Sequence, residues 1–225
     1  MLRKLLICAA LVAGSAGANA GAFLLDEGFD AVVNPGWSLP DWYVANLTNP
    51  AASATSWFEG NTGNFDAAAG AAGSYLASNV FTAGSAASVD NWLITPMVHV
   101  ESGVADLSFS TRTQGDWPGD YMEVLVNTTG APLTSINLGE WASLGVIGAD
   151  SFPTDWASFA FHYNSNETDI RFAFRYLVDD AQNFGSYIGV DSVRITSVPE
   201  PGTLALLALG MLLAPLVLRR RRARI

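Results

Sequence analysis

Residues 170–176 read IRFAFRY, and apolar residues occupy every second position of this stretch. Side chains of a β-strand point alternately to the two faces of a sheet, so the pattern predicts a strand with one buried face. The arginines at positions 171 and 175 then lie on the opposite face. This stretch therefore points to a fold built from half-buried strands.

The same two-residue period recurs through the middle of the chain. It predicts strands over residues 107–113 and 122–126, and further extended segments over 92–100, 159–163 and 187–196. Gly, Pro, Asn and Asp residues separate these segments, and no helical period of useful length lies between them. Many short strands with turn signals are typical of a β-sandwich. The predicted fold class is all-β, a jelly-roll-like antiparallel β-sandwich.

The first twenty residues have the layout of a secretory leader. Two basic residues precede an apolar run over Leu5–Val12, and residues 18–20 (ANA) form a small-residue peptidase site. This order is that of a signal peptide, and the apolar run is too short for a stable membrane span. We expect cleavage after Ala20, and prefer this interpretation to a buried N-terminal helix.

The other end, residues 198–225, carries a second signal in several parts. Val198-Pro199-Glu200-Pro201 precedes an uncharged apolar run over residues 203–218, and five arginines follow. The run approaches the length of a bilayer-spanning helix, and the arginines favour a cytoplasmic C-terminus. We therefore expect a transmembrane helix at residues 203–218 that holds the exported part outside the membrane until it is processed.

These three parts, in this order and at the terminus, resemble the PEP-CTERM protein-sorting signal. The resemblance implies an exosortase-type enzyme that cleaves near Pro199–Pro201, in a Gram-negative bacterium that makes exopolysaccharide. The alternative is a plain C-terminal anchor in which VPEP occurs by chance. On the first interpretation the protein crosses the inner membrane, is anchored transiently, and reaches the cell surface or the extracellular medium.

Charge restricts the partners of the part between the two signals. Residues 21–198 contain twenty carboxylates, four arginines and no lysine, a net charge of −16. Such a surface repels phosphate backbones, so nucleic-acid binding is excluded as a function, whereas cations are attracted. The single cysteine, Cys8, lies in the leader, so the exported part forms no disulfide. Its length suits one domain, residues 21–197, with a sizeable core.

Seven short strings follow one another through this domain. They are LDEGFD (25–30), GSYLASN (73–79), DNWLITP (90–96), LSFSTRT (107–113), GDYMEVLVNTTG (119–130), RFAFRY (171–176) and YIGVDSV (187–193). Their order and coverage resemble the choice-of-anchor J domain, a relative of the cleaved-adhesin and MAM-like jelly rolls. The resemblance implies a jelly-roll fold and a surface location, since this family often accompanies anchoring signals.

The resemblance also implies a calcium site where the first and last strands meet, at Asp26, Glu27 and Asp191. Calcium prefers oxygen ligands from carboxylates and carbonyls. Asp191 lies among apolar neighbours, and an unpaired buried charge is costly, so its carboxylate needs a partner. The family often has a second acid at the next position, where this chain has Ser192. The alternative is that Asp191 accepts hydrogen bonds from backbone amides.

Aromatic residues suggest a second kind of site. Trp117 lies in the loop GDWPG and is the first candidate for stacking on a sugar, followed by Trp42 and Tyr43. The alternative is that these rings fill the core of the sandwich.

Signals for catalysis are missing. The chain has no G-x-S-x-G elbow and no H-E-x-x-H motif, and its two histidines are far apart in sequence. We therefore expect a non-enzymatic protein with a role in adhesion or in the extracellular matrix. The alternative is a carbohydrate-binding module for the producer's exopolysaccharide. A secreted glycoside hydrolase is the third hypothesis, and it needs two carboxylates about 5–10 Å apart across a cleft.

Overall fold

The computed structural model describes residues 22–30, 39–49, 56–84, 88–101, 103–115, 118–148, 151–166 and 168–199. The predicted leader and the predicted transmembrane helix lie outside these residues. No helix of the part that is described is long and apolar enough to cross a membrane. The predicted domain boundary at residue 197 falls inside the last strand, which runs through Pro199.

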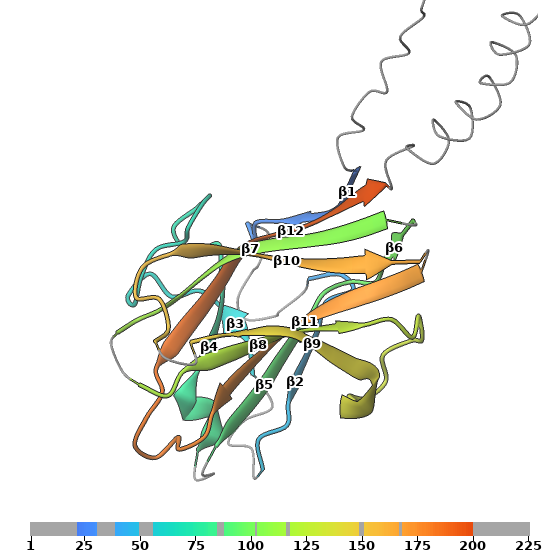
Figure 1. Cartoon of the computed structure of the whole chain (residues 1–225). Helices are drawn as coiled ribbons and strands as arrows, with labels where there is room; N and C mark the ends of the chain where they lie inside the picture. The colour runs from blue at the N-terminus through green and yellow to red at the C-terminus, as the bar shows by residue number, and fades with distance from the viewer. Residues whose placement is uncertain are drawn as a thin grey trace, which may run out of the picture. The chain divides into compact units, whose positions relative to one another are not determined.

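Two six-stranded sheets lie face to face (Figure 1). One sheet has the order β10 (Ala157–Ser165), β7 (Gly103–Thr113), β12 (Tyr187–Pro199), β4 (Leu76–Asn79) and β3 (Phe58–Glu59), and β1 (Ala22–Glu27) also pairs with β12. The other has the order β2 (Tyr43–Asn46), β5 (Val89–Ile94), β11 (Thr168–Val178), β8 (Tyr121–Asn127) and β9 (Trp141–Ile147), and β6 (Val98–Val100) also pairs with β11. Every pairing is antiparallel. The predicted all-β sandwich is therefore confirmed.

The stretch IRFAFRY forms the middle of β11. Phe172, Phe174 and Tyr176 are fully buried in the core between the two sheets, as the alternation predicts. Ala173 lies on the opposite face and is buried too, because a second apolar cluster around Trp92 covers it. The outer face of this sheet is thus less polar than the alternation alone indicates.

The other predicted strands are also present. Residues 107–113 belong to β7, residues 122–126 to β8, residues 159–163 to β10 and residues 187–196 to β12. The extended segment over 92–100 is divided into β5 and β6 around Pro96. Proline has no N–H to give to a sheet ladder, which explains the break.

β12 is the strand on which the candidate sites depend. One edge of β12 pairs with β7, and its other edge pairs first with β4 and then with β1. Between these two partners, at Asp191–Arg194, the register with β7 shifts, and Ser192 has a positive φ of 53°. A bulge of this kind changes the direction of the side chains around it.

Candidate functional site

The first and last strands meet, as the family resemblance implies. β1 pairs with β12 so that Asp26 lies opposite Arg194, and the two side chains form an exposed ion pair at 2.8 Å (Nε to Oδ1). Glu27 lies opposite Val193, and its Oε1 accepts a hydrogen bond from the Phe29 N–H at 2.7 Å. Both acidic side chains therefore have partners within the domain.

Asp191 is fully buried at the bulge of β12. Its Oδ2 accepts hydrogen bonds from the N–H groups of Ala68 (2.8 Å) and Ala69 (3.1 Å), in the loop ahead of β4, and its Oδ1 accepts one from the Ser192 N–H. Burial raises the pKa of the Asp191 carboxyl, and these amide hydrogen bonds act against that rise. The carboxylate fastens the Ala68–Ala69 loop to the last strand.

The three predicted calcium residues do not gather into one cluster. Among the described residues, no group of three or more His, Cys, Asp or Glu side chains is placed to hold a metal ion. Asp26 and Glu27 are consecutive residues of a strand, so their side chains leave it on opposite faces. The three carboxylates therefore do not converge on one point in this structure, and calcium binding at them stays a prediction.

The predicted sugar-stacking residues have different positions. Trp42 is only 8% exposed and packs edge-to-face on Phe29, with ring centroids 5.4 Å apart. Tyr43 is half-buried against the cluster around Trp92. Of the two interpretations of Trp42, the structure supports the one in which the ring fills the core. Trp117 lies outside the described residues.

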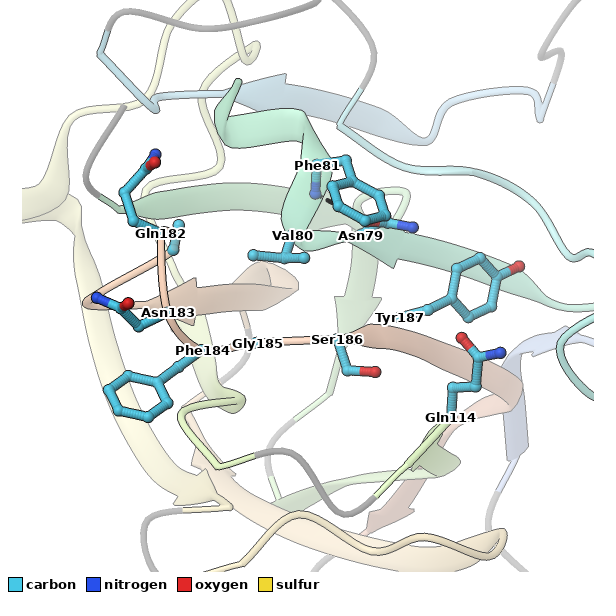
Figure 2. A pocket seen from close by; sticks show the side chains of 11 residues that line it. Asn79, Val80, Phe81, Gln114, Gln182, Asn183, Phe184, Gly185, Ser186 and Tyr187 are labelled. Atoms are coloured by element: carbon cyan, nitrogen blue, oxygen red, sulfur yellow. Dashed lines mark hydrogen bonds between the residues drawn. The ribbon is translucent and has the colours of Figure 1, made fainter. Parts of the chain in front are cut away.

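The described part instead has an open pocket that the sequence did not indicate. Its cavity volume is about 350 Å³, and it lies between the turn η1 (Val80–Ala83), the loop that leads into β12, and the residue that follows β7 (Figure 2). The side chains of Phe81, Gln114 and Ser186 are drawn around it in Figure 2. The lining residues are Asn79, Val80, Phe81, Gln114, Ala181, Gln182, Asn183, Phe184, Gly185, Ser186 and Tyr187.

One rim of the pocket is η1, a single turn of 3-10 helix. Asn79 begins the turn: its Oδ1 accepts a hydrogen bond from the Phe81 N–H at 2.8 Å, which caps the turn. Val80, Thr82 and Ala83 are buried, so they anchor the turn on the sandwich. Phe81 is the residue left on the outer side, and its side chain is 83% exposed.

The opposite rim is the loop between β11 and β12. The carbonyl oxygen of Asp180 accepts hydrogen bonds from the N–H groups of Asn183 (3.2 Å) and Phe184 (2.9 Å). Gly185 has a φ of +91°, and a Cβ at this position would lie 2.9 Å from side-chain atoms of both Val178 and Val80. Only glycine suits this conformation and this contact. The loop thus turns sharply, and the Phe184 ring remains 43% exposed at the rim.

The floor of the pocket rests on Asp120, which is 1% exposed. Asp120 Oδ1 accepts hydrogen bonds from the Tyr176 hydroxyl (2.6 Å) and the Ser186 N–H (2.9 Å), and Oδ2 accepts one from the Thr113 hydroxyl (2.9 Å). The Ser186 carbonyl accepts a hydrogen bond from the Val80 N–H at 2.9 Å. Both rims are therefore connected through the Ser186 backbone.

Burial raises the pKa of the Asp120 carboxyl, and its hydrogen bonds from Tyr176, Ser186 and Thr113 act against that rise. Burial also raises the pKa of the Tyr176 hydroxyl, and the neighbouring Asp120 charge raises it further. Asp120 lies beneath the floor rather than in the lining. Its role is to hold the loop in place.

The lining of the pocket is uncharged. Two exposed phenylalanines and four side-chain amides, those of Asn79, Gln114, Gln182 and Asn183, lie around it (Figure 2). Carboxamides donate and accept hydrogen bonds, and aromatic rings offer apolar faces. This chemistry suits an uncharged ligand with both hydroxyl groups and apolar patches.

A second hollow, of about 220 Å³, has charged residues in its lining, Glu140 and Arg171. It contains one carboxylate, and the larger pocket contains none. A two-carboxylate glycoside hydrolase needs both groups in one cleft. Neither hollow offers that pair.

The two histidines lie on exposed surface. His99 Nδ1 is 2.8 Å from Asp169 Oδ1, and His162 Nδ1 is 2.6 Å from Asp106 Oδ1. These are local pairs between neighbouring strands, β6 with β11 and β10 with β7.

The pocket residues come from three stretches that are far apart in sequence. A phenylalanine within a polar loop, as in DAQNFG (180–185), is the sequence signal that could have drawn attention to Phe184. Phe81 has no such signal, because its exposure depends on which residues of η1 are buried. Asp120 resembled an ordinary turn residue in the sequence.

Two family models match the chain. The model of the PEP-CTERM protein-sorting motif matches residues 197–222, and the Cleaved Adhesin Domain model matches residues 42–138. No curated protein matches the chain.

Solved structures share the fold of the described part. The K1 cleaved adhesin domain of Lys-gingipain from Porphyromonas gingivalis W83 is 17% identical, with a TM-score of 0.54 over 79% of this chain and 99% of that chain. The K2 cleaved adhesin domain of Lys-gingipain is 15% identical, with a TM-score of 0.54 over 76% of this chain and 98% of that chain. Those chains consist almost entirely of the matching region. In this chain, Gly21–Pro199 form one compact unit by themselves.

The predicted motif and the matches agree at the C-terminal end. Val198 and Pro199 lie in β12, opposite Val104 and Gly103 of β7, and Glu200 and Pro201 lie outside the described residues. The motif and the adhesin-type domain together indicate an exported, cell-surface protein. The chain therefore carries a PEP-CTERM protein-sorting motif behind a β-sandwich domain that is similar to cleaved adhesin domains.

Proposed function

We propose that this protein is a non-catalytic adhesion or matrix protein, which an exosortase-type enzyme processes after export. Its transmembrane helix holds it at the inner membrane before processing, and the mature domain then reaches the cell surface or the medium. The observation that carries the proposal is the combination of two matches in one chain, the sorting motif at residues 197–222 and the cleaved-adhesin model at residues 42–138.

The folded domain leaves little chain in front of the motif, because β12 continues through Pro199. We therefore expect processing to occur immediately beside the sandwich. Pro199 lies at the end of the strand, where a missing N–H costs the ladder least. Cleavage at or after this position would leave the domain with nearly all of β12.

The test is the fate of the full chain in a bacterium that has an exosortase. Wild-type protein is expected in the surface or medium fraction without residues 203–218, as mass spectrometry of its C-terminus would measure. A variant with all four VPEP residues replaced by alanine should remain in the membrane fraction at full length. Equal processing of both chains would contradict the proposal.

A second candidate function is the binding of the producer's exopolysaccharide. The uncharged pocket favours it, since side-chain amides and exposed rings gather there on a strongly acidic domain. Calcium binding at Asp26, Glu27 and Asp191 is a separate proposal, carried by the family resemblance and by the meeting of β1 and β12.

A further inference from the structure

We propose that the pocket between η1 and the β11–β12 loop binds an uncharged saccharide, with Phe81 as the stacking platform and Gln114 and Asn79 as hydrogen-bonding groups. The proposal names the site and the ligand class for the second candidate function and rests on it. Its basis is the charge, the exposure and the rigidity of the pocket.

The acidic domain and the uncharged lining of the pocket together favour an uncharged ligand. The domain between residues 21 and 198 has a net charge of −16, yet none of the eleven lining residues carries a charge. An anionic polymer would be repelled by the domain and would meet no cation in the pocket. A cation would meet no carboxylate in the lining. The remaining class is a neutral molecule that contacts the pocket through hydrogen bonds and apolar surface.

The exposed phenylalanine rings at the pocket favour a ligand with apolar faces. Phe81, at 83%, is the most exposed large apolar side chain of the described part, and Phe184 at the opposite rim is 43% exposed. A ring in that position contributes little to folding, because burial is what makes an apolar side chain stabilising. A sugar ring has an apolar C–H face that can cover such a side chain, and hydroxyl groups around its edge.

The amides supply the polar half of the contact. A carboxamide has an acceptor oxygen and two N–H donors, and a hydroxyl group likewise donates and accepts. Asn79 uses its oxygen to cap η1, which leaves its NH₂ group available. Asn183 is turned toward Asp180, whose Oδ2 accepts a hydrogen bond from it at 2.9 Å. Gln114 is exposed beside Tyr187 in Figure 2, and we assign it the main polar contact.

The pocket is built before any ligand arrives. The Asn79 cap fixes η1, the Asp120 carboxylate fixes Ser186, and Gly185 allows the sharp turn of the loop. Rigid walls reduce the ordering cost of binding. A volume of about 350 Å³ lies at the lower end of the range for small-ligand sites, about 300–1,000 Å³. This hollow suits one or a few sugar units of a longer chain better than the broad flat interface of a folded protein.

Titration of the isolated domain with polysaccharides tests the proposal. Residues 21–199 would be titrated by calorimetry with the neutral and the anionic fractions of the producer's exopolysaccharide, and with xylan, galactan, dextran and alginate. We expect binding to at least one neutral polymer. Phe81→Ala should weaken it about 5- to 10-fold, as the loss of one aromatic contact does, and Gln114→Ala about 3- to 10-fold.

Phe23→Ala is the matched control. Phe23 is 66% exposed on β1 opposite Thr196, about 30 Å along β12 from Tyr187 at the spacing of strand residues. Its removal should leave the affinity unchanged. Circular dichroism melting would confirm that all three variants fold, since each replaces an exposed side chain.

The possible outcomes distinguish a wrong assignment of the pocket from a wrong second candidate function. Binding to a neutral polymer that Phe81→Ala and Gln114→Ala leave unchanged would overturn the assignment of the pocket and keep carbohydrate binding as a function. Binding to anionic polymers alone would overturn the ligand class. No binding to any polysaccharide would overturn both the pocket and the second candidate function, and export and sorting would stand.

Discussion

Asp120 and Asp191 are both buried carboxylates whose pKa is raised by burial, and they are held by different partners. Asp120 accepts two hydrogen bonds from buried hydroxyls and one from a backbone N–H. Asp191 accepts its hydrogen bonds from backbone amides, two of them in an exposed loop. Each fastens a loop to the sandwich, one beneath the pocket and the other at the bulge of β12.

The two residues show two ways in which hydrogen bonds stabilise a buried carboxylate in an acidic domain. The two hydroxyls around Asp120 are themselves buried. Their other acceptors, the carbonyl oxygens of Ser186 (3.2 Å from the Tyr176 hydroxyl) and Tyr187 (3.4 Å from the Thr113 hydroxyl), are more distant than the carboxylate. The amides around Asp191 belong to exposed alanines and can bind water instead. The two sites should therefore respond differently to the same substitution.

The largest effect is expected at Asp120. Asp120→Ala removes the nearest acceptor of the buried Tyr176 and Thr113 hydroxyls and the acceptor of the Ser186 N–H, which should lower the free energy of unfolding by about 3–5 kcal/mol. Chemical denaturation of residues 21–199 measures this. Asp155→Ala, on exposed surface, is the control and should change stability by less than about 0.5 kcal/mol. A similar loss of stability in Asp120→Ala and Asp155→Ala would contradict a special stabilising role of the buried Asp120.

Asp191→Ala should cost less, about 1–2 kcal/mol, because water can reach the Ala68 and Ala69 amides once the carboxylate is gone. Denaturation midpoints and hydrogen exchange at these two amides would both report the change. Exchange should accelerate in the loop and remain slow in β11. A loss as large as that of Asp120→Ala would show that the loop is part of the core.

Added calcium should also distinguish Asp191 from Asp120. If Asp191 contributes to a calcium site, added calcium should raise the melting temperature of the wild type by several degrees over EDTA, through ligand-linked stabilisation. The shift should vanish in Asp191→Ala and persist in Asp120→Asn. An unchanged wild-type melting temperature, with no bound metal by elemental analysis, would refute the calcium proposal.

The smallest effect concerns pH. A carboxyl whose pKa is raised in the folded state binds more protons there than in the unfolded chain, so stability falls as pH rises from its ordinary value of 3.8 through the folded pKa. The stability of the wild type relative to Asp120→Asn should therefore decrease over that window and then level off. Asp191→Asn should show the same trend. Unfolding free energies between pH 4 and pH 8 measure it, and a difference that grows with pH would contradict the raised pKa.

The strands could be predicted because their signal is local. A two-residue period within IRFAFRY is enough to place β11 and its inner face. The burial of Ala173 could not be predicted, since it depends on Trp92 and Trp141 from two other strands. For the same reason the sequence left both interpretations of Trp42 open, and its contact with Phe29 places it in the core.

The candidate sites also differ in whether the sequence could predict them. The meeting of β1 and β12 came from a family resemblance, and the structure shows it. The pocket joins Phe81, Gln114 and Phe184, which lie in three separate segments. Their proximity is a product of the sheet order, β7 beside β12 and β12 beside β4, which no local pattern encodes.

The most direct test of matrix binding is the location of the mature protein within the producing culture. Wild type and Phe81→Ala would be expressed as full chains, and the fraction of each that sediments with the washed exopolysaccharide would be measured. Both should be processed at the same C-terminal site. We expect the wild type to stay with the polysaccharide and a larger fraction of Phe81→Ala to be found in the free medium. Equal retention of the two chains would contradict this expectation.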